Sequence, residues 1–188
     1  CVVNGVTRYL ETEARQQLLP TFETEEIECL GLIPEERSLL GVSVSQLAEH
    51  LGARFVSDGM GSGNLLVRFQ VGAMSLDPAE QWFGQYGDNA AIVRGDRPDI
   101  QLSALRANIS ALVLTDGVEP IEYVMYEAEQ EGVPVMVVKS DTIATMDAMN
   151  SLMERALFDH PRKLDRFVQL VDEYVDLQCV LGALGIEQ

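Results

Sequence analysis

Histidine, lysine and cysteine are scarce in this chain of 188 residues, and each shortage excludes a class of site. The two histidines, His50 and His160, are far apart and stand beside no carboxylate cluster. The three cysteines, Cys1, Cys29 and Cys179, are an odd number without a Cys-x-x-Cys spacing. This usage argues against a disulfide framework or a zinc site and is typical of a reducing cytosol. We therefore expect a cytoplasmic protein without a bound metal.

Long apolar runs and the common catalytic motifs are also missing. No run is long enough to cross a membrane as a helix, and no signal-peptide pattern opens the chain. The sequence has no Gly-x-Ser-x-Gly elbow, no His-Glu-x-x-His pair, no cysteine near a histidine and no Walker lysine motif. We expect no membrane partner and no catalytic residue in this chain.

Positive charge is the third shortage, because 30 acidic residues face 13 basic ones and leave a net charge of −17. The only lysines are Lys139 and Lys163, and the arginines are scattered. A field of this sign repels phosphate backbones and anionic lipid headgroups, so we expect no binding to nucleic acid. A small anionic ligand can still bind at a local arginine or a helix N-terminus.

What the chain does contain is alternation between short apolar runs and helical patterns. Strand-like residues 1–6, a helix over 7–19 ended by Pro20, and a strand over 27–33 form one β-α-β unit. A domain boundary is expected near Leu40. The chain opens inside a strand at Cys1, so we expect it to be a fragment of a longer protein or a processed one.

A second alternating region follows the boundary. Its predicted strands are 90–93, 111–114 and 134–138, and its predicted helices are 43–51, 99–108, 119–131 and 142–157. Such alternation indicates an α/β fold with a mostly parallel sheet and right-handed crossovers. Residues 161–184 are predicted to form one long amphipathic helix, whose apolar tail packs on its own domain or on another subunit. One face of this helix carries Leu164, Phe167, Val168, Val171, Tyr174 and Val175.

Three turns are expected to open at one edge of the sheet, where ligands bind in open α/β folds. They are Gly95-Asp96-Arg97, Thr115-Asp116-Gly117 and Ser140-Asp141-Thr142. Their residue types have a structural explanation, since Asp and Thr cap helices and Gly forms tight turns. The alternative is a ligand site, because an arginine beside backbone N–H groups suits a phosphate or carboxylate. Spacing alone leaves both explanations open.

At these residues the chain resembles the DRTGG domain family. Gly95-Asp96-Arg97 and Thr115-Asp116-Gly117 are similar to the two family signatures, although the second is Thr-Gly-Gly in the family and Asp116 departs from it. Residues 71–74, 87–89, 132–135 and 141–142 also match, and the resemblance covers about residues 41–155. It implies a fold like the N-terminal domain of HPr kinase/phosphorylase, and a regulatory and self-associating role.

Residues 1–40 are similar instead to the last β-α-β unit of a dethiobiotin-synthetase-like P-loop domain. That pairing resembles the N-terminal half of long bacterial phosphotransacetylases. We therefore expect three parts: a P-loop remnant (1–40), a DRTGG domain (41–158) and a C-terminal helix (159–188).

Three hypotheses about function follow. The first is a non-catalytic regulatory domain that self-associates as a homodimer or larger homo-oligomer. It would sense a small anionic metabolite, such as an adenine nucleotide, at Gly95, Asp96, Arg97, Thr115, Asp116, Gly117, Asp141 and Thr142. The second is the tail of an ATP-dependent enzyme or phosphate acetyltransferase, for which a P-loop upstream of Cys1 is the discriminator. The third is a purely structural dimerisation module, disrupted by a charge at Val171 or Val175.

Overall fold

The structure is a computed structural model that describes residues 1–25, 27–57, 61–73 and 79–183. The chain divides into two compact units, one of residues 1–39 with 158–188 and one of residues 40–157. Among the described residues no helix is both long and apolar enough to cross a bilayer. The glycine-rich segment 58–60, the matched Met74, and Leu184 at the end of the predicted tail lie outside the described residues.

A five-stranded sheet forms the centre of the larger unit, in the order β4-β9-β8-β7-β6. β6 (Arg68–Val71), β7 (Asn89–Arg94), β8 (Ala111–Thr115) and β9 (Val135–Val137) are parallel, and β4 (Arg54–Ser57) joins β9 antiparallel. Every residue of β8 is buried, as expected for a parallel strand covered on both faces. The predicted α/β fold with a mostly parallel sheet is confirmed.

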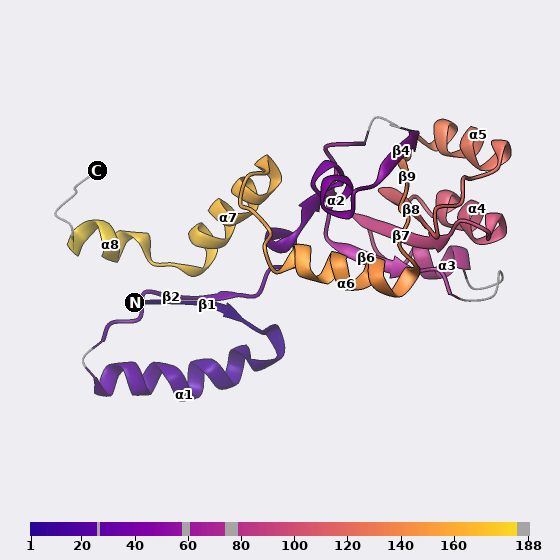
Figure 1. Ribbon diagram of the computed structural model, residues 1–188. Helices are drawn as coiled ribbons and strands as arrows, with labels where there is room; N and C mark the ends of the chain where they lie inside the picture. Colours follow the sequence, from indigo (N-terminus) through magenta and orange to yellow (C-terminus); the bar gives the residue numbers. More distant parts are fainter. Residues whose placement is uncertain (26, 58–60, 74–78, 184–188) are drawn as a thin grey trace. The chain divides into compact units, whose positions relative to one another are not determined.

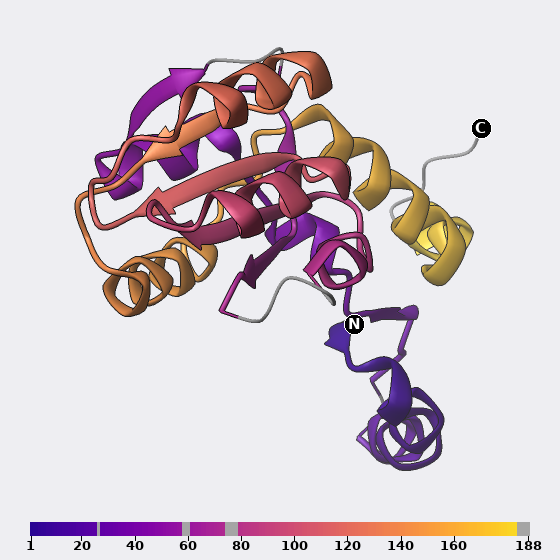
Figure 2. The same ribbon diagram turned by 90° about the vertical axis from the view of Figure 1, so that its right-hand side faces the viewer.

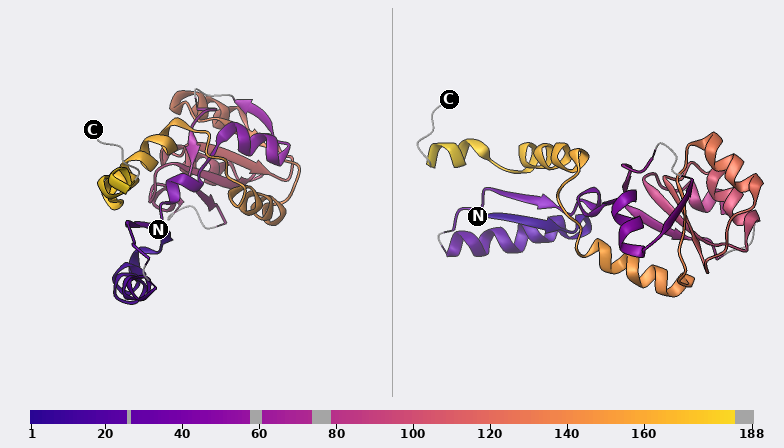
Figure 3. Two further views of the ribbon diagram at one scale, coloured as in Figure 1. Left: turned by 90° about the vertical axis from the view of Figure 1, so that its left-hand side faces the viewer. Right: turned by 45° about the horizontal axis from the view of Figure 1, so that its top comes forward.

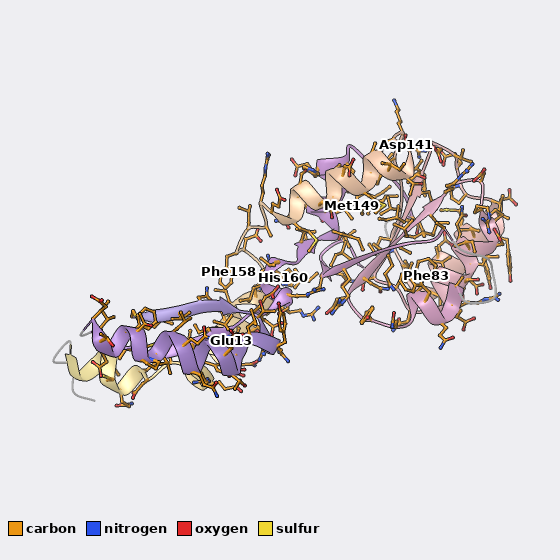
Figure 4. All side chains as sticks on the ribbon, turned by 90° about the horizontal axis from the view of Figure 1, so that it is seen from below. Glu13, Phe83, Asp141, Met149, Phe158 and His160 are labelled. Carbon is orange, nitrogen blue, oxygen red and sulfur yellow. The ribbon has the colours of Figure 1, made fainter. Side chains whose placement is uncertain are left out.

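Helices cover both faces of this sheet (Figure 1 and Figure 2). α3 (Ala79–Phe83), α4 (Pro98–Arg106) and α5 (Glu122–Glu131) contribute to one apolar cluster, and α2 (Val44–Leu51) and α6 (Thr142–Met153) contribute to the other. Phe83 of α3 and Met149 of α6 mark the two sides of the sheet in Figure 4. The crossovers after β6, β7 and β8 therefore lie on one face, whereas the chain leaves β9 toward the other.

The start of this unit follows the local sequence closely. Ser43 caps α2 in a capping box, in which its hydroxyl accepts from the Gln46 N–H and the Gln46 side chain accepts from the Ser43 N–H. Gly52 ends the helix in the left-handed conformation at φ 58°. The short strands β3 (Val42–Ser43) and β5 (Leu65–Leu66) pair antiparallel beside it.

The smaller unit contains a parallel pair of strands, β1 (Val2–Val6) and β2 (Gly31–Pro34), joined by α1 (Glu11–Thr24), which runs alongside them (Figure 3). The predicted helix end at Pro20 is wrong, because α1 continues to Thr24. Proline removes one backbone N–H from the helix. The hydroxyls of Thr21 and Thr24 donate to the carbonyls of Gln17 and Pro20, at 2.9 and 2.8 Å, and support the turns on either side.

The C-terminal segment forms two helices, α7 (Pro161–Tyr174) and α8 (Leu177–Ala183), rather than the single helix predicted. Val175 is extended between them and forms a β-bridge with Gly31. A Cβ on Gly31 would lie 2.2 Å from the carbonyl oxygen of Tyr174, so the close approach requires glycine. The break therefore comes from a contact distant in sequence.

Candidate functional site

The three predicted turns lie together at the carboxyl edge of the sheet. β7, β8 and β9 are parallel neighbours, and the turns leave them in the same direction. The Gly95 N–H donates to the Thr115 carbonyl at 3.2 Å. The N–H groups of Asp116 and Gly117 donate to the carbonyls of Ser140 and Val138, at 2.9 and 2.8 Å. Backbone hydrogen bonds therefore connect the turn after β8 with both of its neighbours.

At the first turn, Arg97 and the preceding Arg94, which ends β7, are both paired with nearby aspartates. Arg97 forms a two-pronged ion pair with Asp99, with nitrogen to oxygen distances of 2.9 and 2.8 Å. The hydrogen bond from Arg97 holds the pKa of the Asp99 carboxyl below its usual range. Arg94 pairs with Asp96 at 2.6 Å and lies 3.8 Å from Asp116. These side chains are all substantially exposed, so the pairs contribute little to stability.

Gln101 of α4 is hydrogen-bonded to the backbone at the first turn. Its side-chain amide donates to the carbonyls of Arg94 and Gly95, at 2.9 and 3.0 Å, and the residue is fully buried. The side-chain oxygen has no hydrogen-bond partner. The amide cannot be reversed without setting this oxygen against two carbonyl oxygens. Gln101 therefore fixes the backbone of the turn.

The second turn has an unusual backbone, because Asp116 and Gly117 are both left-handed, at φ 66° and 67°. Glycine adopts this conformation without steric cost, and aspartate is one of the few other residues that visits it routinely. The departure of Asp116 from the Thr-Gly-Gly signature therefore preserves the backbone geometry. The Thr115 hydroxyl contacts the Asp116 carboxylate at 3.3 Å and the Thr142 hydroxyl at 3.0 Å.

The third turn ends at the start of α6. Asp141 is the N-cap, and its carboxylate accepts from the Ala144 N–H at 2.8 Å. Figure 4 shows Asp141 at this end of the helix. Thr142 reaches back to Thr115, as described above, and the exposed Lys139 lies just before the cap. All eight predicted site residues are thus placed along one edge of the sheet.

Three further residues at this edge were not singled out from the sequence. Nothing in the sequence distinguishes Arg94 from the other scattered arginines. Gln101 could have been found, because its spacing from Ile100, Ala104 and Leu105 places a polar side chain on the apolar face of a helix. The sequence marks Lys139 only as one of two lysines.

Other parts of the described chain are weaker candidates for a ligand or metal site. A groove of about 880 Å³ lies at the far end of α3 and α4, where Trp82, Arg106 and Asn108 line it, and it does not include the turns. The described residues contain no group of three or more His, Cys, Asp or Glu side chains placed to hold a metal ion.

Comparison with known proteins identifies the class to which this fold and edge belong. The DRTGG domain family matches residues 46–152, more than half of the chain. The chain therefore belongs to the DRTGG domain family.

Similar curated proteins are phosphate acetyltransferases. That of Nitratidesulfovibrio vulgaris is 27% identical over an alignment of 187 residues. The match covers 91% of this chain and 26% of the relative. The enzyme of Salmonella typhimurium is 24% identical, and the match covers 84% of this chain and 23% of the relative. The enzyme of Escherichia coli is 26% identical, and the match covers 81% of this chain and 22% of the relative. The chain spans about a quarter of the length of these relatives.

A solved structure shares the fold. It contains the CBS and DRTGG domains of the regulatory region of Clostridium perfringens pyrophosphatase, complexed with its activator, diadenosine tetraphosphate. The TM-score is 0.51 at 14% identity, and the match covers 85% of this chain and 74% of the other. Both the predicted DRTGG resemblance and the similarity to phosphotransacetylases are confirmed, whereas the assignment of residues 1–40 to a P-loop domain stays a prediction.

Proposed function

We propose that this chain is a cytoplasmic regulatory domain that binds a small anionic metabolite, in the first instance an adenine nucleotide, and performs no chemistry itself. The observation that carries the proposal is the meeting of the three predicted turns at one sheet edge, where the helices that follow β8 and β9 lie on opposite faces of the sheet. Crevices at such switch points are where ligands bind in open α/β sheets. The diadenosine tetraphosphate bound by the regulatory region of the pyrophosphatase supports a nucleotide as the first ligand to test.

The electrostatics of the edge are compatible with an anion. The pairs of Arg94 with Asp96 and of Arg97 with Asp99 are exposed. Such pairs contribute only about 0–1 kcal/mol. A phosphate accepts two hydrogen bonds from one guanidinium group and can replace the aspartate as partner.

Calorimetry with AMP, ADP, ATP and diadenosine tetraphosphate tests the proposal. We expect at least one of them to bind and Arg97→Ala to weaken the binding. Arg106→Ala is the matched control, since Arg106 pairs with Glu127 near the opposite end of α4 and its removal changes the net charge equally. Equal binding by wild type and Arg97→Ala would remove Arg97 from the site, and no binding by any of the four nucleotides would end the nucleotide proposal.

The second candidate function, self-association, is favoured by α7. Leu164, Phe167 and Val168 are 51%, 41% and 55% exposed, whereas Lys163 and Leu170 are the buried residues of this helix. Sedimentation velocity of wild type and Val168→Glu tests whether this apolar stripe pairs two copies. Val175 is less suitable for the test, because it bridges to Gly31. A wild type that sediments as a monomer at all concentrations contradicts this role.

If the chain is part of a larger protein like its phosphate acetyltransferase relatives, we infer that it regulates that protein. The test is to compare the acetyltransferase activity of such a protein, with and without the nucleotide that binds here. An activity that does not respond to the bound nucleotide would contradict regulation.

A further inference from the structure

Lys139 lies just after β9, whose following helix covers the face of the sheet opposite to the helix that follows β8. It follows β9 and precedes Asp141, the cap of α6. A Cβ on Gly117 would lie 3.9 Å from the Cα of Lys139, so the backbones after β8 and β9 are in direct contact there. α5 continues from β8 on one face of the sheet and α6 continues from β9 on the other. By the switch-point rule, the crevice at Lys139 is the favoured position for a ligand.

The charges at this edge single out the same residue. Arg94 is held by Asp96 and Arg97 is held by Asp99. Within the described parts of the chain, Lys139 takes part in none of the hydrogen bonds or ion pairs. An anion that approaches Lys139 therefore displaces no carboxylate, whereas one that approaches Arg97 must replace Asp99.

Exposed apolar side chains occur on both of the segments that leave this part of the edge. Val118 and Ile121, between β8 and α5, are 39% and 53% exposed. Ile143, the second residue of α6, is 74% exposed. Both segments begin at the contact between Gly117 and Lys139, so they offer a ligand a cation and apolar side chains on either side of that contact. This combination matches a nucleoside phosphate better than a simple inorganic anion.

We propose that Lys139 is the principal contact for the anionic group of the ligand, and that the apolar part of a nucleoside phosphate packs against Ile121 and Ile143. This inference rests on the proposed nucleotide-binding function of the edge. It places the principal anion contact at Lys139, between β8 and β9, and leaves Arg97, in the turn after β7, as a weaker contact.

Calorimetry with ATP separates the two positions. We expect Lys139→Gln to weaken ATP binding about tenfold or more, which corresponds to the loss of one charge-assisted hydrogen bond. Lys139→Arg, which keeps the charge, is expected to stay within about threefold of wild type, a difference smaller than one such bond, and Arg97→Gln is expected to weaken ATP binding less than Lys139→Gln does. Arg106→Gln controls for the change in net charge. Weaker binding by Arg97→Gln than by Lys139→Gln, or equal binding by Lys139→Gln and Arg106→Gln, overturns the proposal and leaves nucleotide binding itself intact.

A labelling experiment tests Lys139 without assuming a nucleotide. Lys163 is only 1% exposed, so Lys139 is the accessible one of the two lysines. An amine-reactive acetylating reagent is applied with inorganic pyrophosphate or with sodium chloride at the same ionic strength, and mass spectrometry follows the labelling of Lys139. We expect pyrophosphate, and not sodium chloride, to slow the labelling of Lys139.

Calorimetry and labelling together show whether the nucleotide proposal or the anion contact at Lys139 has failed. Protection of Lys139 by pyrophosphate in a protein that binds no nucleotide supports the anion contact and contradicts the nucleotide proposal. ATP binding without protection of Lys139, and with no loss in Lys139→Gln, contradicts the anion contact alone. Absence of both binding and protection overturns both.

Discussion

Replacing Gly95 by alanine tests whether the signature turns are packed as closely as the structure shows. Gly95 is buried between the turns after β7 and β8. A Cβ at this position would lie 2.5 Å from the carbonyl oxygen of Val118, 2.6 Å from the Val118 Cβ and 3.1 Å from the carbonyl oxygen of Thr115. Two of these three atoms belong to the backbone, so a change of rotamer cannot relieve the clash. The turns must separate, and the hydrogen bond from the Gly95 N–H to Thr115 must lengthen.

The size of the effect follows from the cost of overpacking. One methyl group forced into a well-packed region costs about 1–3 kcal/mol, and two backbone contacts below 3.2 Å place Gly95→Ala near the upper limit. For a unit of this size we expect a fall in melting temperature of roughly 10 °C. Trp82 is the only tryptophan and lies in α3 of the same unit, so its fluorescence follows the unfolding of this unit in urea.

Gly87→Ala is the matched control for this experiment. Gly87 precedes β7, and a Cβ there meets no atom within 4 Å. We expect its free energy of unfolding to stay within about 0.5 kcal/mol of wild type. The close packing of the turns is refuted if Gly95→Ala is as stable as wild type, or if Gly87→Ala loses as much stability as Gly95→Ala.

Three further predictions concern the same edge. Asp116→Ala should lower the free energy of unfolding by about 1 kcal/mol because alanine resists the left-handed backbone, whereas Asp116→Gly should stay near wild type; urea unfolding that ranks the two variants in the opposite order contradicts this. Gln101→Leu should cost about 1–3 kcal/mol, because two buried carbonyls at the end of β7 lose their donor, and a neutral result would show that water replaces the amide. The ion pair from Arg97 lowers the pKa of Asp99, so its contribution is present above the ordinary aspartate pKa and is lost as pH falls through the lowered value. Arg97→Gln should raise the pKa of Asp99 in an NMR titration, and an unchanged pKa would show that the ion pair does not persist in solution.

The sheet and the position of its three turns were predictable because the responsible signals are local. β7 and β8 are short, nearly continuous apolar runs, which is how a parallel strand covered on both faces reads in sequence. Ser43 and Asp141 are caps that the helix-start rules identify. Because parallel strands end at the same edge, the positions of the three turns followed from strand direction alone.

The features that escaped prediction depend on contacts between distant residues. Val175 interrupts the C-terminal helix because Gly31, far away in sequence, pairs with it. β4 joins the sheet antiparallel, which its own residues do not specify. The pairing of Arg97 with Asp99 depends on side-chain geometry, which the sequence does not specify. The proposed role of Lys139 illustrates the same limit, since it depends on the opposite faces covered by the helices after β8 and β9 and not on neighbouring residues.

The strong negative charge of the chain and an anion site at its sheet edge are physically compatible. Charges separated by more than about 8 Å are largely screened at physiological ionic strength. A nucleic acid extends well beyond that distance and meets the repulsion of many of the 30 acidic residues. In the proposed site a mononucleotide would interact mainly with the nearest groups, where the ammonium group of Lys139 has no carboxylate partner among the described residues and the guanidinium groups of Arg94 and Arg97 lie at the end of β7 and in the turn after it. On this proposal, short-range geometry would select the anion and the net charge would restrict it to a small one.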